Sequence, residues 1–346
     1  MLIEDSKPMI TVIIVARNEE NYIEGLLKSL YNQTLDEDNY EIIFVDGMSE
    51  DNTVNIVNRF IHSYPNRMKL LKNNKKTLPP GWNMGIKAAK GNYILRIDGH
   101  TLITEDFLEQ YINLIQKQPN VDCVGGIIES KGLGFQGKIN EFIYSHPFGV
   151  GNSKFRTTKK VWEGFVDTVP YGAYKRSVFE KVGYFNEKLR RNEDIEFHKR
   201  MKNLGMEFYM STSIKSTYYV RSTLKGLIQK SLGDGTWTMI ADQSVPGSLR
   251  ARHKAPLYAF LLGLLILILA IFFVPMRWIL TIVGLAYLGA AAWASKTVIR
   301  QSGFVSYLYT IGTFFCLHFF RGLGCFKAYF TREFWYFRNK RKRYAK

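Results

Sequence analysis

The sequence predicts an α/β protein: a mostly parallel sheet flanked by helices, followed by a helical hairpin that spans a membrane. Three observations lead to this prediction. Apolar, β-branched runs recur along the first part of the chain, segments with apolar residues at helical spacing separate them, and two uncharged apolar stretches lie near the C-terminal end. Strands that alternate with helices at this spacing are typical of βαβ units and therefore of a parallel sheet.

The predicted strands are short apolar runs of the kind that is buried on both faces of a parallel sheet. The predicted helices carry apolar residues three or four positions apart, and Pro79-Pro80-Gly81 is expected to break the chain before one of them. Strands are expected over residues 9–15, 40–45, 69–72, 93–97 and 121–129, and helices over 22–30, 54–62, 83–90 and 104–116.

Polar residues follow three of these strands, at residues 17–19, 46–51 and 98–100. The carboxyl ends of parallel strands meet at one edge of a sheet, where ligands of such folds bind. Asp98 and His100 are two residues apart, and a carboxylate with an imidazole can hold a divalent cation. The alternative for this pair is a polar turn that ends the strand.

Asp46 follows the second strand directly. A carboxylate in this place can accept a hydrogen bond from a nucleobase or a ribose, since it lies at the ligand-binding edge. The alternative is that Asp46 caps the next helix, which Ser49 or Asp51 could do equally well.

Composition and missing motifs exclude several classes. There is no GxGxxG turn and no GxxxxGK[ST] loop, which counts against a dinucleotide-dependent dehydrogenase and an NTPase. The three cysteines have no CxxC spacing, so neither a disulfide framework nor a zinc site is expected. The formal net charge of +17 favours nucleic acid, an anionic membrane or a phosphorylated substrate. Because the aromatic residues gather toward the C-terminal end, the membrane is favoured over nucleic acid.

The segments 15–20, 45–53 and 97–100 resemble, in order and spacing, the family 2 glycosyltransferases. These are inverting enzymes of the GT-A fold that use nucleotide-diphosphate sugars. The resemblance covers the first two-thirds of the chain. In the last place of the family's Asp-any-Asp motif this chain has His100, which is similar to the bacterial succinoglycan or exopolysaccharide branch.

The resemblance implies a divalent cation, Mn²⁺ or Mg²⁺, held by Asp98 and His100. It implies a nucleotide-sugar site of Ala16, Arg17, Asn18, Glu19, Asp46, Ser49, Asp98, Gly172 and Ala173.

Glu193 and Asp194 begin another predicted helix, where carboxylates are also common simply as N-terminal charges. The resemblance gives this pair a catalytic role, with Asp194 as the general base and Glu193 as its neighbour. Inverting transfer requires a carboxylate that takes the proton of the attacking hydroxyl, and a cation that neutralises the leaving diphosphate. A partial match to a further family motif suggests acceptor or diphosphate contacts by Gln229, Lys230 and Trp237.

Residues 130–165 are glycine-rich and basic without clear periodicity, and we expect either a substrate loop or lid, or a solvated surface loop. The apolar runs 256–274 and 278–294 are long enough to span a membrane as a hairpin. The alternative is a buried pair of helices.

Basic residues flank both ends of this hairpin, which places the catalytic domain in the cytosol. Residues 304–330 are aromatic but contain charges, so we expect an interfacial or re-entrant segment that keeps the basic tail 338–346 cytosolic. No signal peptide is expected. The predicted domains are a GT-A catalytic domain over 1–250 and a membrane-anchoring region over 251–346, integral to the cell membrane.

The sequence therefore predicts metal-dependent, inverting transfer from a nucleotide-diphosphate sugar, a UDP-sugar first among them. The expected acceptor is a polyprenyl-diphosphate-linked saccharide in exopolysaccharide or cell-surface glycan biosynthesis. Two enzyme alternatives are a polyprenyl-phosphate sugar synthase and a processive polysaccharide synthase. A non-enzyme alternative is an inactive nucleotide-sugar-binding scaffold. No nucleic-acid partner is expected.

Overall fold

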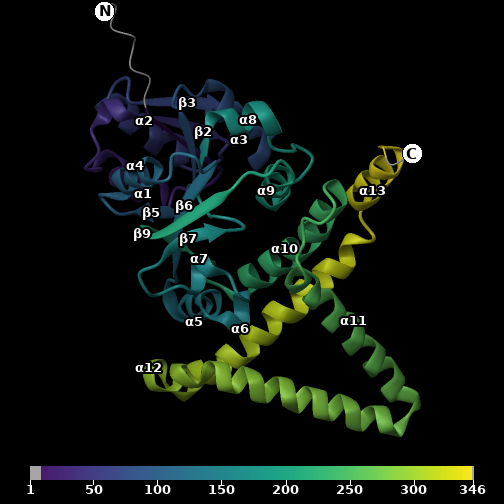
Figure 1. Cartoon of the computed structure of the whole chain (residues 1–346). Coiled ribbons are helices and arrows are strands. Elements are labelled where there is room, and N and C mark those ends of the chain that lie inside the picture. Colours follow the sequence, from purple (N-terminus) through teal and green to yellow (C-terminus); the bar gives the residue numbers. More distant parts are fainter. Residues whose placement is uncertain (1–8, 345–346) are drawn as a thin grey trace, which may run out of the picture. The chain divides into compact units, whose positions relative to one another are not determined.

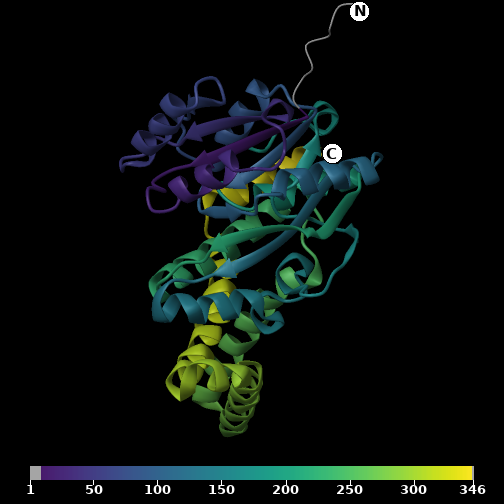
Figure 2. The same ribbon diagram turned by 90° about the vertical axis from the view of Figure 1, so that its left-hand side faces the viewer.

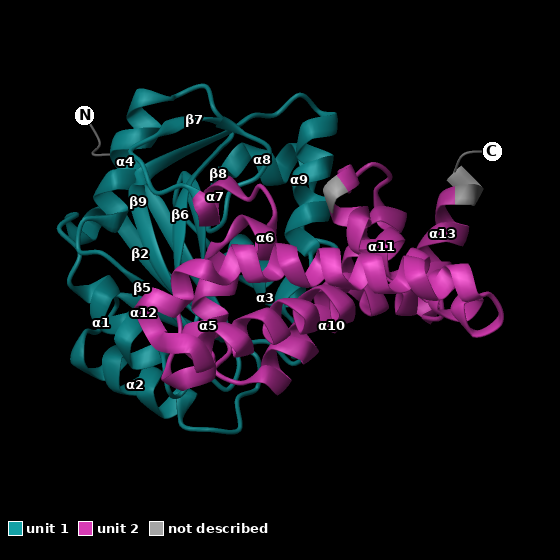
Figure 3. Ribbon diagram, turned by 90° about the horizontal axis from the view of Figure 1, so that it is seen from below, with its two compact units in different colours: residues 1–129, 158–219 teal, residues 130–157, 220–346 magenta. Residues whose placement is uncertain are grey.

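The computed structural model describes residues 9–344, and Figure 1 shows their helices and strands in chain order. Residues 345–346 of the predicted basic tail lie outside the described residues. The chain forms two compact units, each made of two separate stretches (Figure 3). Unit 1 comprises Met1–Glu129 and Thr158–Tyr219, and unit 2 comprises Ser130–Thr157 and Val220–Lys346. These units do not coincide with the predicted domains 1–250 and 251–346. The division of the chain into a catalytic domain and a membrane-anchoring region near residue 250 stays a prediction.

Unit 1 is built on a sheet that has nine strands within the described residues, in the order β3-β2-β1-β4-β8-β6-β9-β5, with β7 paired to β9. Strands β1 to β4 are mutually parallel, which confirms the predicted parallel sheet. Beyond β4 the sheet is mixed, because β8 runs antiparallel to β4. The two longest strands, β6 and β9, lie side by side (Figures 1 and 2). The strands are β1 (Ile10–Ala16), β2 (Tyr40–Asp46), β3 (Met68–Lys72), β4 (Tyr93–Asp98), β5 (Thr101–Ile103), β6 (Cys123–Lys131), β7 (Glu163–Val166), β8 (Ala173–Lys175) and β9 (Phe208–Tyr219).

The helices of unit 1 bury one apolar stripe each against this sheet, as amphipathic helices do. Helix α4 buries Phe107, Leu108 and Tyr111, which join the apolar side chains of β1 and β2 in one core. The helices predicted in this part of the chain, including the one that begins at Glu193, are all present. The helices are α1 (Ile23–Tyr31), α2 (Thr53–Ser63), α3 (Leu78–Ala88), α4 (Phe107–Lys117), α8 (Arg176–Val182) and α9 (Glu193–Asn203), with a 3₁₀ turn η1 (Glu37–Asn39).

The expected chain break at Pro79-Pro80-Gly81 is wrong, because these residues form the first turn of α3. Proline fits the first turn, where its missing N–H has no helical partner to lose. A Cβ on Gly81 would lie 2.5 Å from Val15 Cγ1, and a Cβ on Gly85 would lie 2.5 Å from Ile13 Cγ2. The glycines therefore let α3 pack directly on β1, close to the end that carries the predicted nucleotide loop.

Most of the stretch that was expected to be an irregular loop forms helices: α5 (Gly134–Ser145), α6 (Pro147–Val150) and α7 (Lys154–Thr157). They belong to unit 2, where α5 and α6 pack against α12 (Val274–Ala328) and α7 packs against α5. The His318 imidazole is 2.9 Å from the Phe148 carbonyl, and the Phe148 and Phe314 rings are 5.0 Å apart. The insert is thus a structured part of the helical unit.

The rest of unit 2 is helical: α10 (Leu224–Ser244), α11 (Ala251–Phe272), α12 and α13 (Arg332–Tyr344). Two segments, His253–Phe272 and Val274–Ala328, are long and apolar enough to cross a membrane. Their side chains are largely exposed, with Phe272 73% and Trp278 68% accessible, as expected of surfaces that face lipid rather than water. Gly303, with φ of 83°, interrupts α12 just before the third predicted apolar segment.

Helices α10 and α12 approach each other closely through small residues. A Cβ on Gly235 would lie 2.2 Å from the Arg321 carbonyl oxygen, and one on Gly324 would lie 2.2 Å from that of Leu232. The Thr236 hydroxyl donates to the Gly324 carbonyl at 3.0 Å. Small residues that let helix backbones meet are a common way to join helices in membranes.

Candidate active site

The turns that follow β1 and β2 are joined to each other by hydrogen bonds. The Gly47 amide donates to the Ala16 carbonyl at 2.8 Å, and the Asn18 amide donates to Ser49 Oγ at 3.0 Å. Asn18 Oδ1 accepts from the Glu50 amide at 2.9 Å. Asn18 has φ of 57°, a conformation that asparagine tolerates better than most residues. The two predicted nucleotide loops therefore form one hydrogen-bonded structure.

Two charged residues in these turns also have partners there. Asp46 is 4% exposed, and its carboxylate accepts the Ser49 amide at 3.2 Å, which stabilises the turn. Arg17 forms an exposed ion pair with Glu50 at 2.9 Å. Asp46 therefore stabilises the turn before α2 and does not cap that helix, whose N-cap residue is Asn52. Its contact with a nucleotide stays a prediction.

The end of β4 packs against the end of β1. A Cβ on Gly99 would lie 2.9 Å from Ala16 Cβ and 3.2 Å from Glu19 Cγ, so only glycine fits without a shift. His100 Nδ1 lies 2.9 Å from Glu19 Oε1. Burial alone would lower the pKa of His100, but the hydrogen bond to Glu19 and the negative charges nearby, including that of Asp98, raise this pKa to about 9. The chain thus holds a carboxylate–imidazole pair beside Asp98.

The described residues contain no group of three or more His, Cys, Asp or Glu side chains that could hold a metal ion. Asp98 and His100 alone supply a carboxylate and an imidazole. Because Glu19 accepts the Nδ1 proton, Nε2 is the ring atom for a cation, which would have to displace the proton that the raised pKa keeps on Nε2. These residues fit a cation that takes its other ligands from a bound diphosphate and water.

Tyr171 lies beside Asp98 and was not among the predicted site residues. Its hydroxyl is 2.7 Å from Thr101 Oγ1 and donates to Asp98 Oδ2 at 3.4 Å. Its φ is 44°, an unusual conformation for a large side chain and one that is often found at functional sites. No local pattern in the sequence predicts a positive φ at a tyrosine.

The Gly172-Ala173 backbone lies next to β4. The Arg96 amide donates to the Gly172 carbonyl at 3.4 Å, and Ala173 pairs with Leu95. A Cβ on Gly172 would lie 2.7 Å from Cys123 Sγ, which explains the glycine by packing. These two residues are therefore close to the strand end that carries Asp98, and their contact with a donor sugar stays a prediction.

Helix α9 begins with the two predicted catalytic carboxylates. Glu193 is 4% exposed and forms an ion pair with Arg96 of β4 at 3.0 Å, whereas Asp194 is partly exposed. Burial raises the pKa of Glu193, Arg96 opposes that rise, and the charges of Asp194 and Asp98 add to it. Glu193 thus contacts one buried arginine, on which the charges of Asp98 and Asp194 also act. Arg96 had no predicted role, although a charge within an apolar strand was a visible signal in the sequence.

The three remaining candidates, Gln229, Lys230 and Trp237, lie on α10 in unit 2. Lys230 there forms an ion pair with Asp234 at 3.1 Å, one helical turn away. Their part in acceptor or diphosphate binding stays a prediction.

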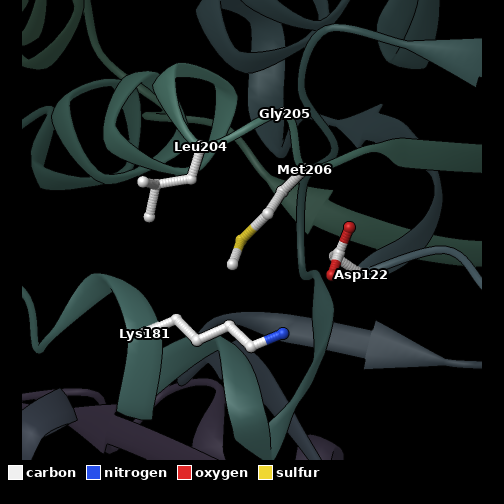
Figure 4. Close-up of a pocket in the computed structure, with 5 residues that line it drawn as sticks. All are labelled: Asp122, Lys181, Leu204, Gly205 and Met206. Carbon is white, nitrogen blue, oxygen red and sulfur yellow. The ribbon is translucent and has the colours of Figure 1, made fainter.

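A surface hollow shown in Figure 4 contains none of the predicted site residues. Lys181 of α8 lies on one side of it, and the turn that follows α9 forms another side. The hollow is open, and Leu204 on its rim is 58% exposed. The residues that line it are Asp122, Lys181, Leu204, Gly205 and Met206.

Comparison with known proteins decides the family. The model of the family described as "Glycosyl transferase family 2" matches residues 11–183, half of the chain. The chain belongs to glycosyl transferase family 2. It is therefore a glycosyltransferase, which confirms the resemblance drawn from the sequence.

Two curated relatives are similar over about 65% of this family 2 chain. One is the dolichyl N-acetyl-alpha-D-glucosaminyl phosphate 3-beta-D-2,3-diacetamido-2,3-dideoxy-beta-D-glucuronosyltransferase of Methanococcus voltae. It is 32% identical over 234 residues, which cover 71% of that protein. The other is the succinoglycan biosynthesis protein ExoA of Rhizobium meliloti, which is 26% identical over 226 residues that cover 67% of that protein. Relatives of this family 2 enzyme thus act in polysaccharide and glycan biosynthesis.

A solved structure supports the fold. A mannosyltransferase of Pyrobaculum calidifontis, in complex with GDP-Man and Mn²⁺, superposes with a TM-score of 0.59 at 18% sequence identity. The superposition covers 94% of this chain and 88% of that one. The predicted GT-A architecture is confirmed.

Proposed function

We propose that this family 2 enzyme transfers a sugar, with inversion, from a nucleotide-diphosphate sugar to a lipid-linked saccharide at a membrane surface. The observation that carries the proposal is the end of β4, where Asp98 and His100 lie near the Gly172-Ala173 backbone. Asp194 follows Glu193, which pairs with Arg96 of the same strand. At the edge of the sheet where folds of this kind bind ligands, Asp194 would be the base and Asp98 with His100 would anchor the diphosphate. The Gly172-Ala173 backbone would lie against the sugar.

The joined turns after β1 and β2 would receive the nucleotide, with Asp46 on its base or ribose. Asp98 and His100 would hold a divalent cation, Mn²⁺ or Mg²⁺, whose charge neutralises the leaving diphosphate. The Pyrobaculum calidifontis structure, solved with GDP-Man and Mn²⁺, supports a donor and a metal of this kind. A UDP-sugar remains the first donor to test.

Asp194 would take the proton of the acceptor hydroxyl as that oxygen attacks the anomeric carbon from the face opposite the diphosphate. It starts α9, where it is partly exposed and therefore accessible to an acceptor. No covalent intermediate is needed, because a single displacement inverts the anomeric centre. Gln229, Lys230 and Trp237 would contribute to the acceptor or diphosphate contacts.

The acceptor would lie in the membrane. Two helices of spanning length and the dolichyl phosphate in the name of the Methanococcus voltae relative support a lipid-linked saccharide. A formal net charge of +17 suits an anionic lipid diphosphate and its membrane surface. The catalytic unit would face the cytosol, where nucleotide sugars are made.

The test uses the full chain in lipid nanodiscs with a panel of UDP- and GDP-sugars, and follows release of the nucleoside diphosphate. We expect release to depend on Mn²⁺ or Mg²⁺ and on a polyprenyl-diphosphate-linked saccharide, with a product one sugar longer. A polymer as product would instead indicate a processive synthase, and transfer to polyprenyl phosphate itself a lipid-phosphate sugar synthase. Nucleotide binding without any release would indicate an inactive scaffold. Equal rates with a water-soluble oligosaccharide would contradict the lipid-linked acceptor.

A further inference from the structure

Arg96 lies in the middle of a strand whose other residues are mostly apolar, and it is deeply buried. Its Nη2 is 3.0 Å from Glu193 Oε1, and the two side chains are only 12% and 6% exposed. Removing two charges from water is costly, and apolar side chains of the same volume are often at least as stabilising. The pair therefore calls for a reason other than stability alone.

The guanidinium of Arg96 is held in a fixed position. It lies 4.5 Å from the centre of the Trp82 ring and 4.7 Å from that of Phe185. Asn83 fixes Phe185 in turn, since its side chain bonds to both the amide and the carbonyl of that residue at 3.0 and 2.9 Å. Strand β4 itself is paired on both sides, by β1 and β8. Arg96 is therefore held rigidly, so a side chain that pairs with it is held in a fixed position too.

The residues at the two ends of this ion pair adjoin the proposed reacting groups. Arg96 is two residues before Asp98, so both side chains project from the same face of β4. Glu193 directly precedes Asp194 in the first turn of α9, after Asn192 with its positive φ of 57°. One buried contact thus ties the strand that carries Asp98 to the helix that carries Asp194.

We infer that Arg96 and Glu193 are positioning residues, whose ion pair fixes the start of α9 against β4 and so aims Asp194 at the acceptor hydroxyl. The inference rests on the proposed function, in which Asp194 is the base. It gives Glu193 a different role from the catalytic one that the sequence suggested. Glu193 acts through its contact with Arg96 and touches neither donor nor acceptor.

The decisive variant replaces both charges, Arg96→Met with Glu193→Leu, in the full chain in nanodiscs. Because no unpaired charge remains, we expect a folded protein that melts no lower than the wild type. It should bind the donor nucleotide as the wild type does. Its kcat should nevertheless fall by about 100-fold, the size of effect that a displacement of about 1 Å can cause, with little change in donor KM.

The single variants Arg96→Gln and Glu193→Gln both break the same pair, so we expect similar losses of kcat that do not add. Arg96→Lys should recover part of the activity that Arg96→Gln loses. The matched control is Glu196→Gln, which breaks another partly buried ion pair of α9, to Arg200 at 3.0 Å. We expect Glu196→Gln to lower the melting temperature and leave kcat within about threefold, since this pair lies within α9 and does not join the helix to β4.

Two results would overturn the inference: wild-type kcat in the double variant, or a loss in Glu193→Gln that far exceeds the loss in Arg96→Gln. The second result would make Glu193 a catalytic residue. Failure of the proposed function is distinguishable, because the wild-type chain itself would then release no nucleotide from any nucleotide sugar.

Discussion

Two polar regions at the same edge of the sheet are built in different ways. At the ends of β1 and β2 the polar groups bond mainly to one another, as the contacts of Asn18 with Ser49 and Glu50 show. At the end of β4 and the start of α9, Glu193 pairs with the buried Arg96, on which the charges of Asp98 and Asp194 also act. The first arrangement satisfies its own hydrogen bonds and shapes a loop. The second concentrates charge that a substrate or a cation can use.

This difference shows that a polar motif at a strand end does not by itself indicate chemistry. Asp46 and Asp98 occupy similar places, as the last residues of β2 and β4, the two neighbours of β1. Asp46 accepts the Ser49 amide at 3.2 Å, whereas the Asp98 carboxylate accepts the Tyr171 hydroxyl at 3.4 Å, a longer contact. Substitutions in the first region should therefore affect stability more than turnover, and those in the second should do the reverse.

The largest expected effect is that of Asp98→Asn, which should lower the transfer rate by about 1,000-fold, because the anchor for the charged diphosphate is lost. Its melting temperature should change little. Asp46→Asn is the matched substitution at the other strand end, and it should lower the melting temperature and retain more activity. Turnover and thermal unfolding of both variants check this, and the opposite ranking would remove the distinction between the two regions.

The next prediction concerns how stability depends on pH through His198 of α9, which hydrogen-bonds to Thr168 and Tyr174 at 2.7 Å each. Burial lowers the pKa of His198 from its usual 6.5 to about 4. Between pH 4 and pH 6.5 the unfolded chain binds one more proton at His198 than the folded chain does. The stabilising contribution of the neutral imidazole is therefore complete above pH 6.5. It is lost as the pH falls toward 4, by an amount on the order of 3 kcal/mol.

Thermal unfolding between pH 4.5 and 7.5 measures this effect. His198→Gln should flatten the dependence, because glutamine can still hydrogen-bond but does not titrate. His62→Gln, which changes an exposed histidine of α2, should leave the slope as it is in the wild type. An equal slope in His198→Gln and the wild type would assign the acid loss to other groups.

Asn18→Ala should destabilise the joined turns by about 2 kcal/mol, through the lost hydrogen bond and the positive φ that alanine resists. Asn18→Gly keeps the backbone conformation and should cost only about 1 kcal/mol, the hydrogen bond alone. Denaturant midpoints of the two variants separate these causes. If both variants melted like the wild type, the turns would not depend on their mutual contacts.

The smallest effect on stability is expected for the exposed Arg17–Glu50 pair, whose side chains are 38% and 71% accessible. Breaking it should change the unfolding free energy by no more than about 0.5 kcal/mol. Glu50→Gln breaks the pair but keeps the positive charge, so comparison with Arg17→Ala isolates that charge. Weaker donor binding in Arg17→Ala alone would support the predicted nucleotide contact, and equal donor binding in both would contradict it.

The sequence predicted the part of the fold that depends on local patterns. Apolar runs marked β1 to β4, and the family resemblance placed Asp46, Asp98 and Asp194 in order. The same patterns missed β9, where runs of serine and threonine interrupt the apolar pattern of a twelve-residue strand. They also missed α5, whose first four residues include two glycines, because its packing against α12 outweighs its low helix propensity.

Contacts between distant residues were not predictable from one sequence. Arg96 and Glu193 are 97 positions apart, and nothing local at either residue indicates the other. The same is true of Glu19 and His100, whose contact converts a two-residue motif into an oriented imidazole. The residues that touch a ligand can be matched to a family motif, whereas the residues that orient them emerge only from the fold.

Turnover of Asp194→Asn at saturating donor and acceptor tests the assignment of the reaction centre most directly. The variant should fold, bind the donor nucleotide as the wild type does, and lose at least about 100-fold in kcat, since a general base contributes a factor of that size or more. Glu180→Gln, an exposed carboxylate change on α8, is the control and should keep wild-type kcat. If kcat of Asp194→Asn stayed within a few-fold of the wild type, Asp194 would not be the base, and the reaction centre would have to be sought elsewhere.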